Sequence, residues 1–243
     1  MSGKDHIYIW PGTEQLIPSV TTVIKDILRE PKLEDWRVVR AVMLARQHRE
    51  ADFDRIKELV NADRDYYGQI GTDVHAVVKA FHDGSKFPEG YNRPEVAPLA
   101  DAYIMWAQAS YVGGPLHCED VAYAELGGLR YGGRPDIPLV TLRAGTYVGT
   151  AKLTVDTTAL IDVKTGSNTR DEWQLQLAGY QMMGYQWWGY DPEVLLTVRI
   201  DRHGGVHAKA WDPASNEFMS MLNLWYWRYG EPELGKRMAD PDE

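Results

Sequence analysis

An apolar, β-prone run at residues 158–165, TALIDVKT, carries two opposite charges, Asp162 and Lys164. Successive side chains of a strand alternate between its faces, so these two charges point to the same face. A buried ion pair is costly to form. The run therefore predicts a strand in which Asp162 and Lys164 are either a structural ion pair or part of a reactive site.

The flanking patterns predict the rest of the fold. Up to about Val112 the apolar spacing is typical of helices, with Pro18 and Ser19 at one helix start and Gly84 at one helix end. From His117 three strands follow, then a helix begun by a capping box of Thr169 and Glu172, a hairpin turning at 203–205 and a last helix. This order predicts an α/β fold with a central mixed sheet flanked by helices and a helical N-terminal cap.

Two regions are expected, joined as one continuous structural unit. Residues 1–115 form the helical cap over the site, and residues 116–243 form the core with the sheet. The long segment between Asp136 and Asp162, which includes RAGTYVGTAKLTVD, is expected to insert a hairpin or loop.

Composition excludes several classes of protein. No apolar run reaches about 18 residues, so no membrane span is expected, and the first residues lack a signal-peptide pattern; a cytoplasmic, intracellular location is the expectation. The single cysteine, Cys118, cannot build an iron–sulfur cluster or a four-thiolate zinc site. His203 and His207 are separated by a Gly-Gly pair that breaks a helix, so zinc is rejected there too. A net charge of −9 excludes general nucleic-acid binding over the whole surface, so any such contact is local or uses metal ions.

Two aspartates are expected to meet at one end of the sheet. If the strands of Asp136 and Asp162 are neighbours, their carboxylates and the Lys164 ammonium share one small volume. Close carboxylates repel each other, and a divalent cation bound through oxygen relieves this. A lysine beside such an ion can orient or deprotonate the attacking water. This set is suited to metal-assisted hydrolysis of phosphodiesters.

Further candidates lie at helical spacing around this set. His75 follows Gly71 by one turn, and the glycine allows close approach to another backbone. Gln176 and Tyr180 share one helix face just after the Lys164 strand, where they can contact phosphate or hold the lysine. Glu125 is either a ligand of a second metal ion or a solvated strand end.

Ordered motifs give the chain a family resemblance. They are PSVT at residues 18–21, Gly71-x-x-x-His75, Gly133-Arg-Pro-Asp136, Asp162-Val-Lys164 and Gln176-x-x-x-Tyr180. Together they resemble the RecB-like branch of the PD-(D/E)XK nucleases, including small exonucleases of bacteriophages and of mitochondrial genome maintenance, over residues 18–190.

The resemblance implies a restriction-endonuclease-like core and one or two Mg²⁺ or Mn²⁺ ions. The implied metal ligands are His75, Asp136, Asp162 and the backbone carbonyl of Val163. It also implies that Lys164 handles the attacking water, and that Gln176 and Tyr180 support the site or the DNA strand. The iron–sulfur members of the branch need four cysteines, which this chain lacks.

The DNA contacts are left with two interpretations. Arg37, Arg40 and Arg46, with Arg49, recur around Trp36 and could line a channel for single-stranded nucleic acid. An exposed helix face balanced by neighbouring acids explains the same pattern equally well. Ser19 and Thr21 are most simply helix N-cap groups, with a phosphate contact as the alternative.

The sequence thus predicts a Mg²⁺- or Mn²⁺-dependent deoxyribonuclease, an exonuclease acting on DNA that is single-stranded or has a free end. Its expected setting is phage-type recombination, repair or replication, with a protein partner from those processes as a candidate and without a membrane. Two alternatives stay open: a structure-selective endonuclease of the same fold, and a non-catalytic nuclease-like protein that binds DNA or assists assembly.

Overall fold

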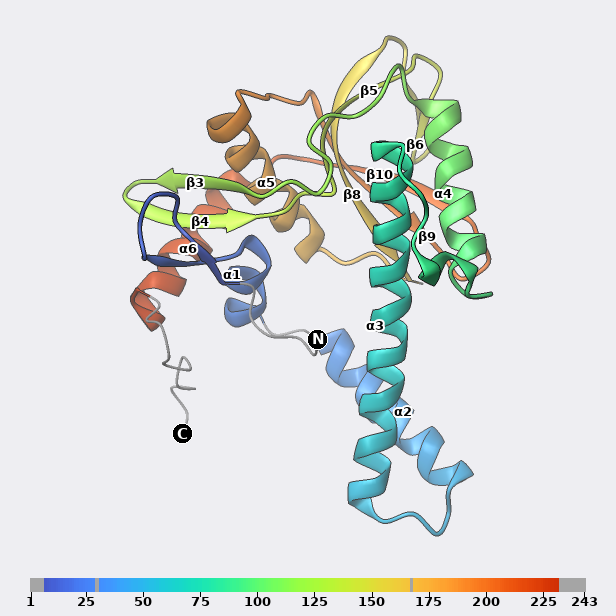
Figure 1. Ribbon diagram of the computed structural model, residues 1–243. Helices are drawn as coiled ribbons and strands as arrows, with labels where there is room; N and C mark the ends of the chain where they lie inside the picture. The colour runs from blue at the N-terminus through green and yellow to red at the C-terminus, as the bar shows by residue number, and fades with distance from the viewer. Residues whose placement is uncertain (1–6, 29–30, 167, 232–243) are drawn as a thin grey trace.

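A mixed four-stranded sheet forms the centre of the computed structural model, which describes residues 7–28, 31–166 and 168–231. The sheet order is β10–β9–β8–β5. β8 runs parallel to β9 and antiparallel to β5, and β9 runs antiparallel to β10 (Figure 1). The bounds are β5 (Ile137–Leu142), β8 (Thr157–Thr165), β9 (Val194–Ile200) and β10 (Val206–Trp211).

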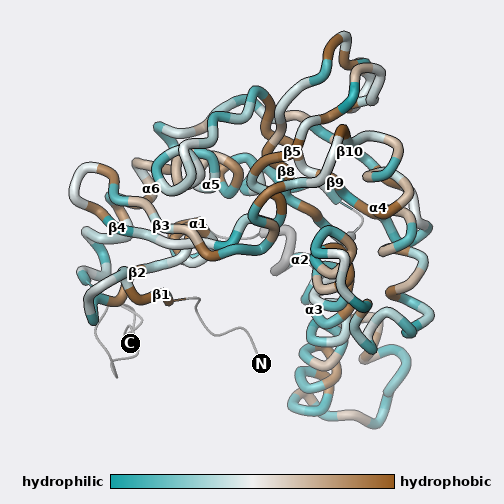
Figure 2. The backbone as a smooth tube through the Cα atoms, turned by 45° about the horizontal axis from the view of Figure 1, so that its top comes forward, coloured by the Kyte–Doolittle hydropathy of each residue, from teal (hydrophilic) through white to brown (hydrophobic). Residues whose placement is uncertain are grey.

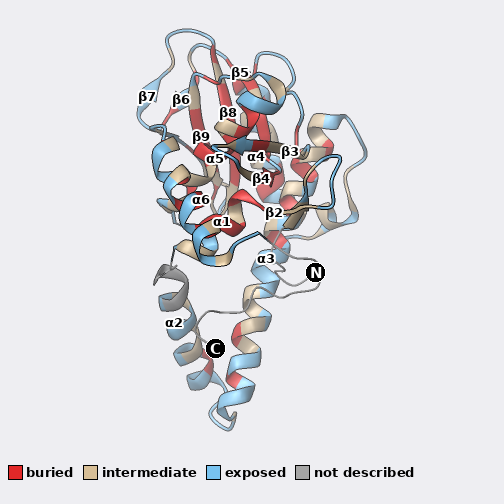
Figure 3. Cartoon of the chain, turned by 90° about the vertical axis from the view of Figure 1, so that its left-hand side faces the viewer, coloured by how far each residue is buried: buried red, intermediate tan, exposed pale blue. Residues whose placement is uncertain are grey.

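Helices cover both faces of this sheet. One face packs against α3 (Phe53–Asp83) and α4 (Ala97–Ser110), and the other against α1 (Val20–Ile27), α5 (Glu172–Trp188) and α6 (Ser215–Tyr229). Buried residues concentrate in β5, β8 and β9 (Figure 3).

The central strand β8 divides its side chains between the two faces. Ala159, Ile161 and Val163 pack in the core with α3 and α4, whereas Leu160 packs in the core with α5 and α6. Strand alternation then places Asp162 on the face of Leu160, toward α5. The predicted common face of the two charges in this strand follows from that alternation.

Three short hairpins accompany the sheet. They are β1 (Ile7–Ile9) with β2 (Leu16–Pro18), β3 (Ala122–Leu126) with β4 (Leu129–Gly133), and β6 (Tyr147–Val148) with β7 (Ala151–Lys152). The β6–β7 hairpin is the insertion expected between Asp136 and Asp162. One expected strand, at residues 127–140, is instead two strands, because Arg134, Pro135 and Asp136 interrupt it between β4 and β5.

One part of the N-terminal region, α2 (Pro31–Gln47) with the first half of α3, projects from the body as an arm. The two helices lie side by side there, around a small core of Leu44, Ile56 and Val60 (Figure 1). The tube of Figure 2 is largely hydrophilic along this arm and more hydrophobic in β5 and β8. A 3₁₀ helix, η1 (Glu89–Asn92), links α3 to α4.

Helix ends follow the expected capping chemistry at two of three places. Ser19 caps α1 by accepting a hydrogen bond from the Thr22 amide, and Gly84 ends α3 at φ 65°. The predicted capping box at Thr169 is wrong. The N-cap of α5 is Asp171, because the Trp173 amide bonds the Arg170 carbonyl in a tight first turn.

The mixed α/β architecture expected from the sequence is confirmed. The core on the α3–α4 side joins residues from before and after position 115, for example Val74 and Val163. The exact division at residue 115 stays a prediction. Among the described residues, no helix combines the length and apolar character needed to cross a membrane.

Gly179 is predicted to be essential for packing α5 against α1 and α6. An added Cβ there would lie 2.9 Å from Phe218 and from Val20, so Gly179→Ala should lower the free energy of unfolding by about 1–3 kcal/mol despite better helix propensity. Gly184→Ala is the matched control in the same helix, since its nearest atom is 3.9 Å away. Urea denaturation measures both. Equal stability of the two variants would contradict this packing.

Candidate active site

The candidate site begins where β5 and β8 pair. Ile137 lies opposite Ile161, which brings Asp136, the residue before β5, beside the middle of β8. Asp136 Oδ2 accepts a hydrogen bond of 2.6 Å from the Val163 amide. The structure therefore brings the Asp136 segment and the Asp162 strand together.

Helix α3 adds His75 to this point. Its Nδ1 lies 3.1 Å from Asp136 Oδ1 and 3.5 Å from Glu119 Oε1. One turn earlier, a Cβ built on Gly71 would lie 3.1 Å from Thr165 Oγ1 of β8. The absence of a side chain at Gly71 thus allows α3 to approach β8 closely enough for His75 to reach the carboxylates.

Glu119 completes a cluster that sequence reasoning missed. One ligand atom each from His75, Glu119 and Asp136 lies within 4.8 Å of the others. The Glu119 backbone has φ 57°, and its amide donates to the carbonyls of Pro135 and Asp136, both at 3.1 Å. The available signal was hairpin pairing: β3 and β4 are antiparallel, so a residue before β3 lies beside a residue after β4.

Glu125, which the sequence offered as a ligand of a second metal ion, does not join this cluster. It lies near the turn of the β3–β4 hairpin, where its carboxylate accepts a hydrogen bond of 2.7 Å from Arg130. Its backbone amide pairs with Gln186 of α5. The acid beside His75 is Glu119, because it lies at the end of the hairpin that meets β5.

Lys164, Gln176 and Tyr180 form a chain of polar contacts on the α5 side. Lys164 Nζ lies 2.7 Å from Asp162 Oδ2 and donates to Gln176 Oε1 at 3.0 Å. Gln176 Nε2 in turn donates to the Tyr180 hydroxyl at 3.1 Å. These contacts place the lysine ammonium over the buried carboxylate, and Gln176 restrains it.

Burial and neighbouring charges shift the pKa values of the groups in this cluster in different directions. Burial alone would lower the pKa of His75, but the facing carboxylates of Asp136 and Glu119 raise it to about 10. Burial raises the pKa of Asp162 to about 6, against the opposing effect of the Lys164 ammonium. For Asp136, the effect of His75 and of the hydrogen bonds outweighs burial, and its pKa is lowered. The metal-free cluster is thus balanced by a protonated imidazole.

The residues present fit a hard divalent cation. Asp162 Oδ2 is buried and has no hydrogen-bond partner, its close neighbour being the Lys164 ammonium. Carboxylate oxygens from Asp136 and Glu119, with the His75 imidazole, form a donor set that suits Mg²⁺ or Mn²⁺, and Asp162, which pairs with Lys164, stays a predicted further ligand. The backbone carbonyl of Val163 stays a predicted further ligand, and its side chain is buried in the core.

The predicted DNA-binding residues of α2 lie on the arm. Trp36 packs partly buried against the small core of the arm, and Arg40 forms an ion pair with Asp63. Arg37 and Arg46 are exposed on α2. An exposed helix face balanced by acids accounts for Arg40, and a DNA contact through Arg37 and Arg46 stays a prediction.

Ser19 and Thr21 lie at the start of α1. Ser19 is 2% exposed and contributes its hydroxyl to the helix cap, where it also meets Thr21 Oγ1 at 3.0 Å. The simpler interpretation of Ser19, as an N-cap group, is confirmed.

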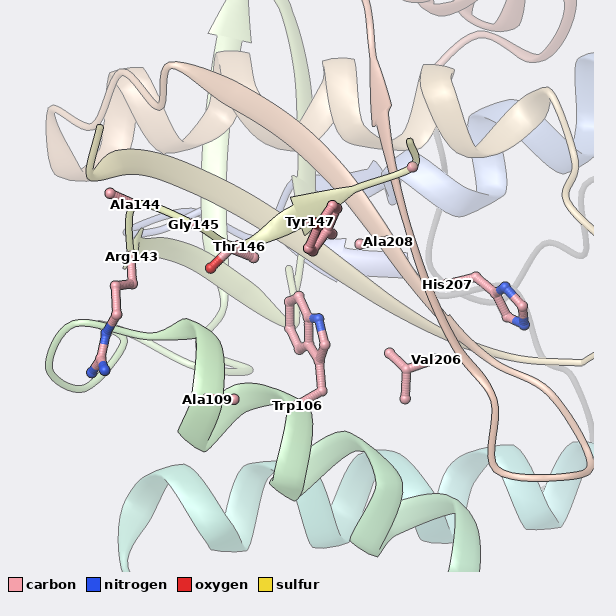
Figure 4. A pocket seen from close by; sticks show the side chains of 11 residues that line it. Trp106, Ala109, Arg143, Ala144, Gly145, Thr146, Tyr147, Val206, His207 and Ala208 are labelled. Carbon is pink, nitrogen blue, oxygen red and sulfur yellow. The ribbon is translucent and has the colours of Figure 1, made fainter. Parts of the chain in front are cut away.

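A cavity of about 520 Å³ lies apart from this cluster, between α4, the β6–β7 hairpin and β10 (Figure 4). Trp106, Tyr147, Arg143 and His207 line it, and none of the cluster residues does. The His207 ring is held by Asp201 at 2.8 Å. The cluster at the sheet end, and not this cavity, brings together acids, an imidazole and an ammonium that could hold a metal ion and place a water.

Comparisons with known proteins give limited likenesses. No protein-family model and no curated protein matches the chain. A crystal structure of a candidate exonuclease from Eubacterium rectale is similar at a TM-score of 0.37 and 12% identity, covering 76% of this chain and 64% of that one. The structure of SSO0001 is similar at a TM-score of 0.27 and 15% identity, covering 63% of this chain and 70% of that one. Both TM-scores lie below 0.5, so neither structure carries weight in assigning a function.

Asp162 is predicted to destabilise the metal-free protein at neutral pH. Its folded pKa is raised, so the stability it contributes is present below about pH 4 and is lost as the pH rises through about 6. Asp162→Asn should therefore have a free energy of unfolding about 1–3 kcal/mol higher than that of wild type at pH 7 in EDTA. The difference between the two proteins should vanish toward pH 4. Urea denaturation across this range checks it. A less stable Asn variant at pH 7 would contradict the burial argument.

Proposed function

We propose that the protein is a Mg²⁺- or Mn²⁺-dependent nuclease that hydrolyses phosphodiester bonds of DNA. The observation that carries this proposal is the meeting of His75, Glu119 and Asp136 with the Asp162–Lys164 pair at one end of the mixed sheet. Three acids and an imidazole suit a divalent cation, and the adjacent ammonium suits an anionic substrate and its attacking water.

Each residue has a proposed task. His75, Glu119, Asp136 and Asp162 would hold the ion, which supplies charge that stabilises the phosphate as negative charge develops on it. Lys164 orients the water that attacks phosphorus, and the ester P–O bond breaks as the new P–O bond forms. Gln176 keeps the lysine in place through its 3.0 Å hydrogen bond, and Tyr180 supports Gln176.

Exonuclease action is the proposed mode, with a DNA strand that has a free end as substrate. The motif order supports this choice, since it resembles small RecB-like exonucleases. A phage-type role in recombination, repair or replication belongs to the same proposal. Covalently closed circular single strands separate the alternatives, because an endonuclease cuts them and an exonuclease does not.

The direct test is incubation of end-labelled single- and double-stranded DNA with Mg²⁺ or Mn²⁺. Wild type should yield a ladder or short products that EDTA abolishes, and Asp136→Asn and Lys164→Met should lose at least about 100-fold in rate, because they remove a ligand or the water-placing group. Wild-type turnover by Asp136→Asn would show that the cleavage does not come from this site.

Glu119 and Glu125 form a matched pair for testing the metal cluster. Glu119→Gln should slow hydrolysis of a small diester, bis(p-nitrophenyl) phosphate, by about tenfold or more, because it removes a charged ligand. Glu125→Gln should leave that rate unchanged, since its carboxylate pairs with Arg130 on the hairpin. A larger loss of rate in Glu125→Gln than in Glu119→Gln would contradict this assignment and indicate Glu125 as the metal ligand.

A further inference from the structure

The β3–β4 hairpin extends outward from the candidate site. β3 begins three residues after Glu119, and β4 ends three residues before Asp136. Because the strands are antiparallel, these two ends meet at the cluster and the turn lies far from it (Figure 1). The position of a residue along this hairpin therefore indicates how far it lies from the site.

One face of the hairpin carries a connected group of aromatic rings. Tyr123 lies opposite Gly132, where a Cβ would stand 3.0 Å from the Tyr8 ring, so the glycine makes room for that ring. The Tyr123 ring centroid lies 6.2 Å from Tyr8, 6.0 Å from Trp10 and 5.1 Å from Trp187. We call these four rings, from β1, the residue after it, β3 and α5, the aromatic track.

The inner end of the track lies on the part of the hairpin that leads to the candidate site. The Tyr8 ring packs beside Gly132, four residues before Asp136. Burial raises the pKa of the Tyr8 hydroxyl, and the charges of Arg134 and Glu119 also act on it. Arg134 is exposed two residues before Asp136. Along the chain, this cation lies between Gly132, which packs beside the Tyr8 ring, and the acid Asp136.

The outer end of the track carries little free charge. The Arg130 guanidinium lies 4.7 Å from the Trp10 ring centroid, and it is also paired with Glu125 at 2.7 Å. Trp187 is 43% exposed, and Tyr8, Trp10 and Tyr123 are half-buried. Attraction at this end therefore comes from ring surface rather than from charge.

The rings meet mainly edge to face, with interplanar angles of 86°, 80° and 62°. In such contacts one ring of the pair presents only its edge and keeps its faces out of the contact, although the Arg130 guanidinium lies over one face of Trp10. The neighbouring group of His117, Trp188 and Tyr190 differs, because His117 and Tyr190 both stack on Trp188, at 15° and 25°. The ring faces that stack within that group are not open to other partners.

We propose that the aromatic track binds the single-stranded part of the DNA substrate, stacking its bases on Tyr8, Tyr123, Trp10 and Trp187 while Arg134 receives the phosphate next to the scissile bond. Aromatic stacking tolerates any base sequence, and a cation marks where the backbone turns toward the acids. This inference rests on the proposed nuclease function, and it names the strand path by which DNA reaches the site.

The test measures binding without cleavage, by anisotropy of a labelled oligothymidine of about 15 nucleotides in EDTA. The double variant Trp10→Ala, Trp187→Ala should raise the Kd about tenfold or more, because stacking on two rings is lost. The salt dependence should keep its slope, since no phosphate contact is removed. Trp187→Phe should restore most of the affinity lost by Trp187→Ala, because a ring is retained.

Trp227→Ala is the matched control, since Trp227 is 82% exposed on α6 and belongs to neither ring group. Unchanged affinity in the double variant, an equal loss in the Trp227 control, or no binding by wild type would each overturn the inference. Hydrolysis of bis(p-nitrophenyl) phosphate tests the nuclease proposal separately, because that ester is too small to span the track. If wild type did not hydrolyse this ester, the proposed nuclease function would be contradicted. The DNA-binding measurements would still show whether the aromatic track binds single strands.

Discussion

The hydrogen bond from the Val163 amide to Asp136 Oδ2 is the contact on which the candidate site depends. It joins the segment before β5 to the central strand β8 at 2.6 Å, and it does so with a buried carboxylate as acceptor. A charged acceptor makes this bond stronger than a neutral one. Because the β3–β4 hairpin ends just before Asp136, the same bond also fixes where Glu119 and the aromatic track begin.

Charge balance then explains the neighbours of this bond. The buried carboxylates of Asp136 and Asp162 would repel each other. His75 pairs with Asp136 and Lys164 pairs with Asp162, and these two cations offset the repulsion. The close approach of α3 at Gly71 and the Gln176 hydrogen bond hold these two cations in place. The arrangement keeps buried acidic groups where a divalent ion can bind them, and their burial lowers the stability of the metal-free protein.

Sequence patterns predicted the strands and helices that carry the charges, because apolar alternation and capping residues are local. The contact of His75 with Asp136, and the pairing of the Asp136 segment with the Asp162 strand, followed the predicted motif order, whereas the role of Asp162 as a metal ligand stays a prediction. Glu119 was missed because its position depends on hairpin pairing and on a backbone at positive φ, neither of which is a local pattern. Glu125 fits the second of its two interpretations, a solvated strand end, and closeness in sequence to a glycine turn could not decide between them because it does not reveal which end of a hairpin meets the sheet. The environment of Trp36 and Arg40 depends on how α2 packs on α3, which helical spacing alone leaves undecided.

The central claim is that the His75–Glu119–Asp136 cluster binds a divalent cation. Calorimetric titration of the metal-free protein with Mn²⁺ tests it most directly, with Asp136→Asn as the comparison. The account predicts saturable Mn²⁺ binding by wild type, released protons as the ion displaces the proton of His75, and an affinity at least about tenfold lower in Asp136→Asn. No Mn²⁺ binding by wild type, or equal binding by the variant, would contradict it.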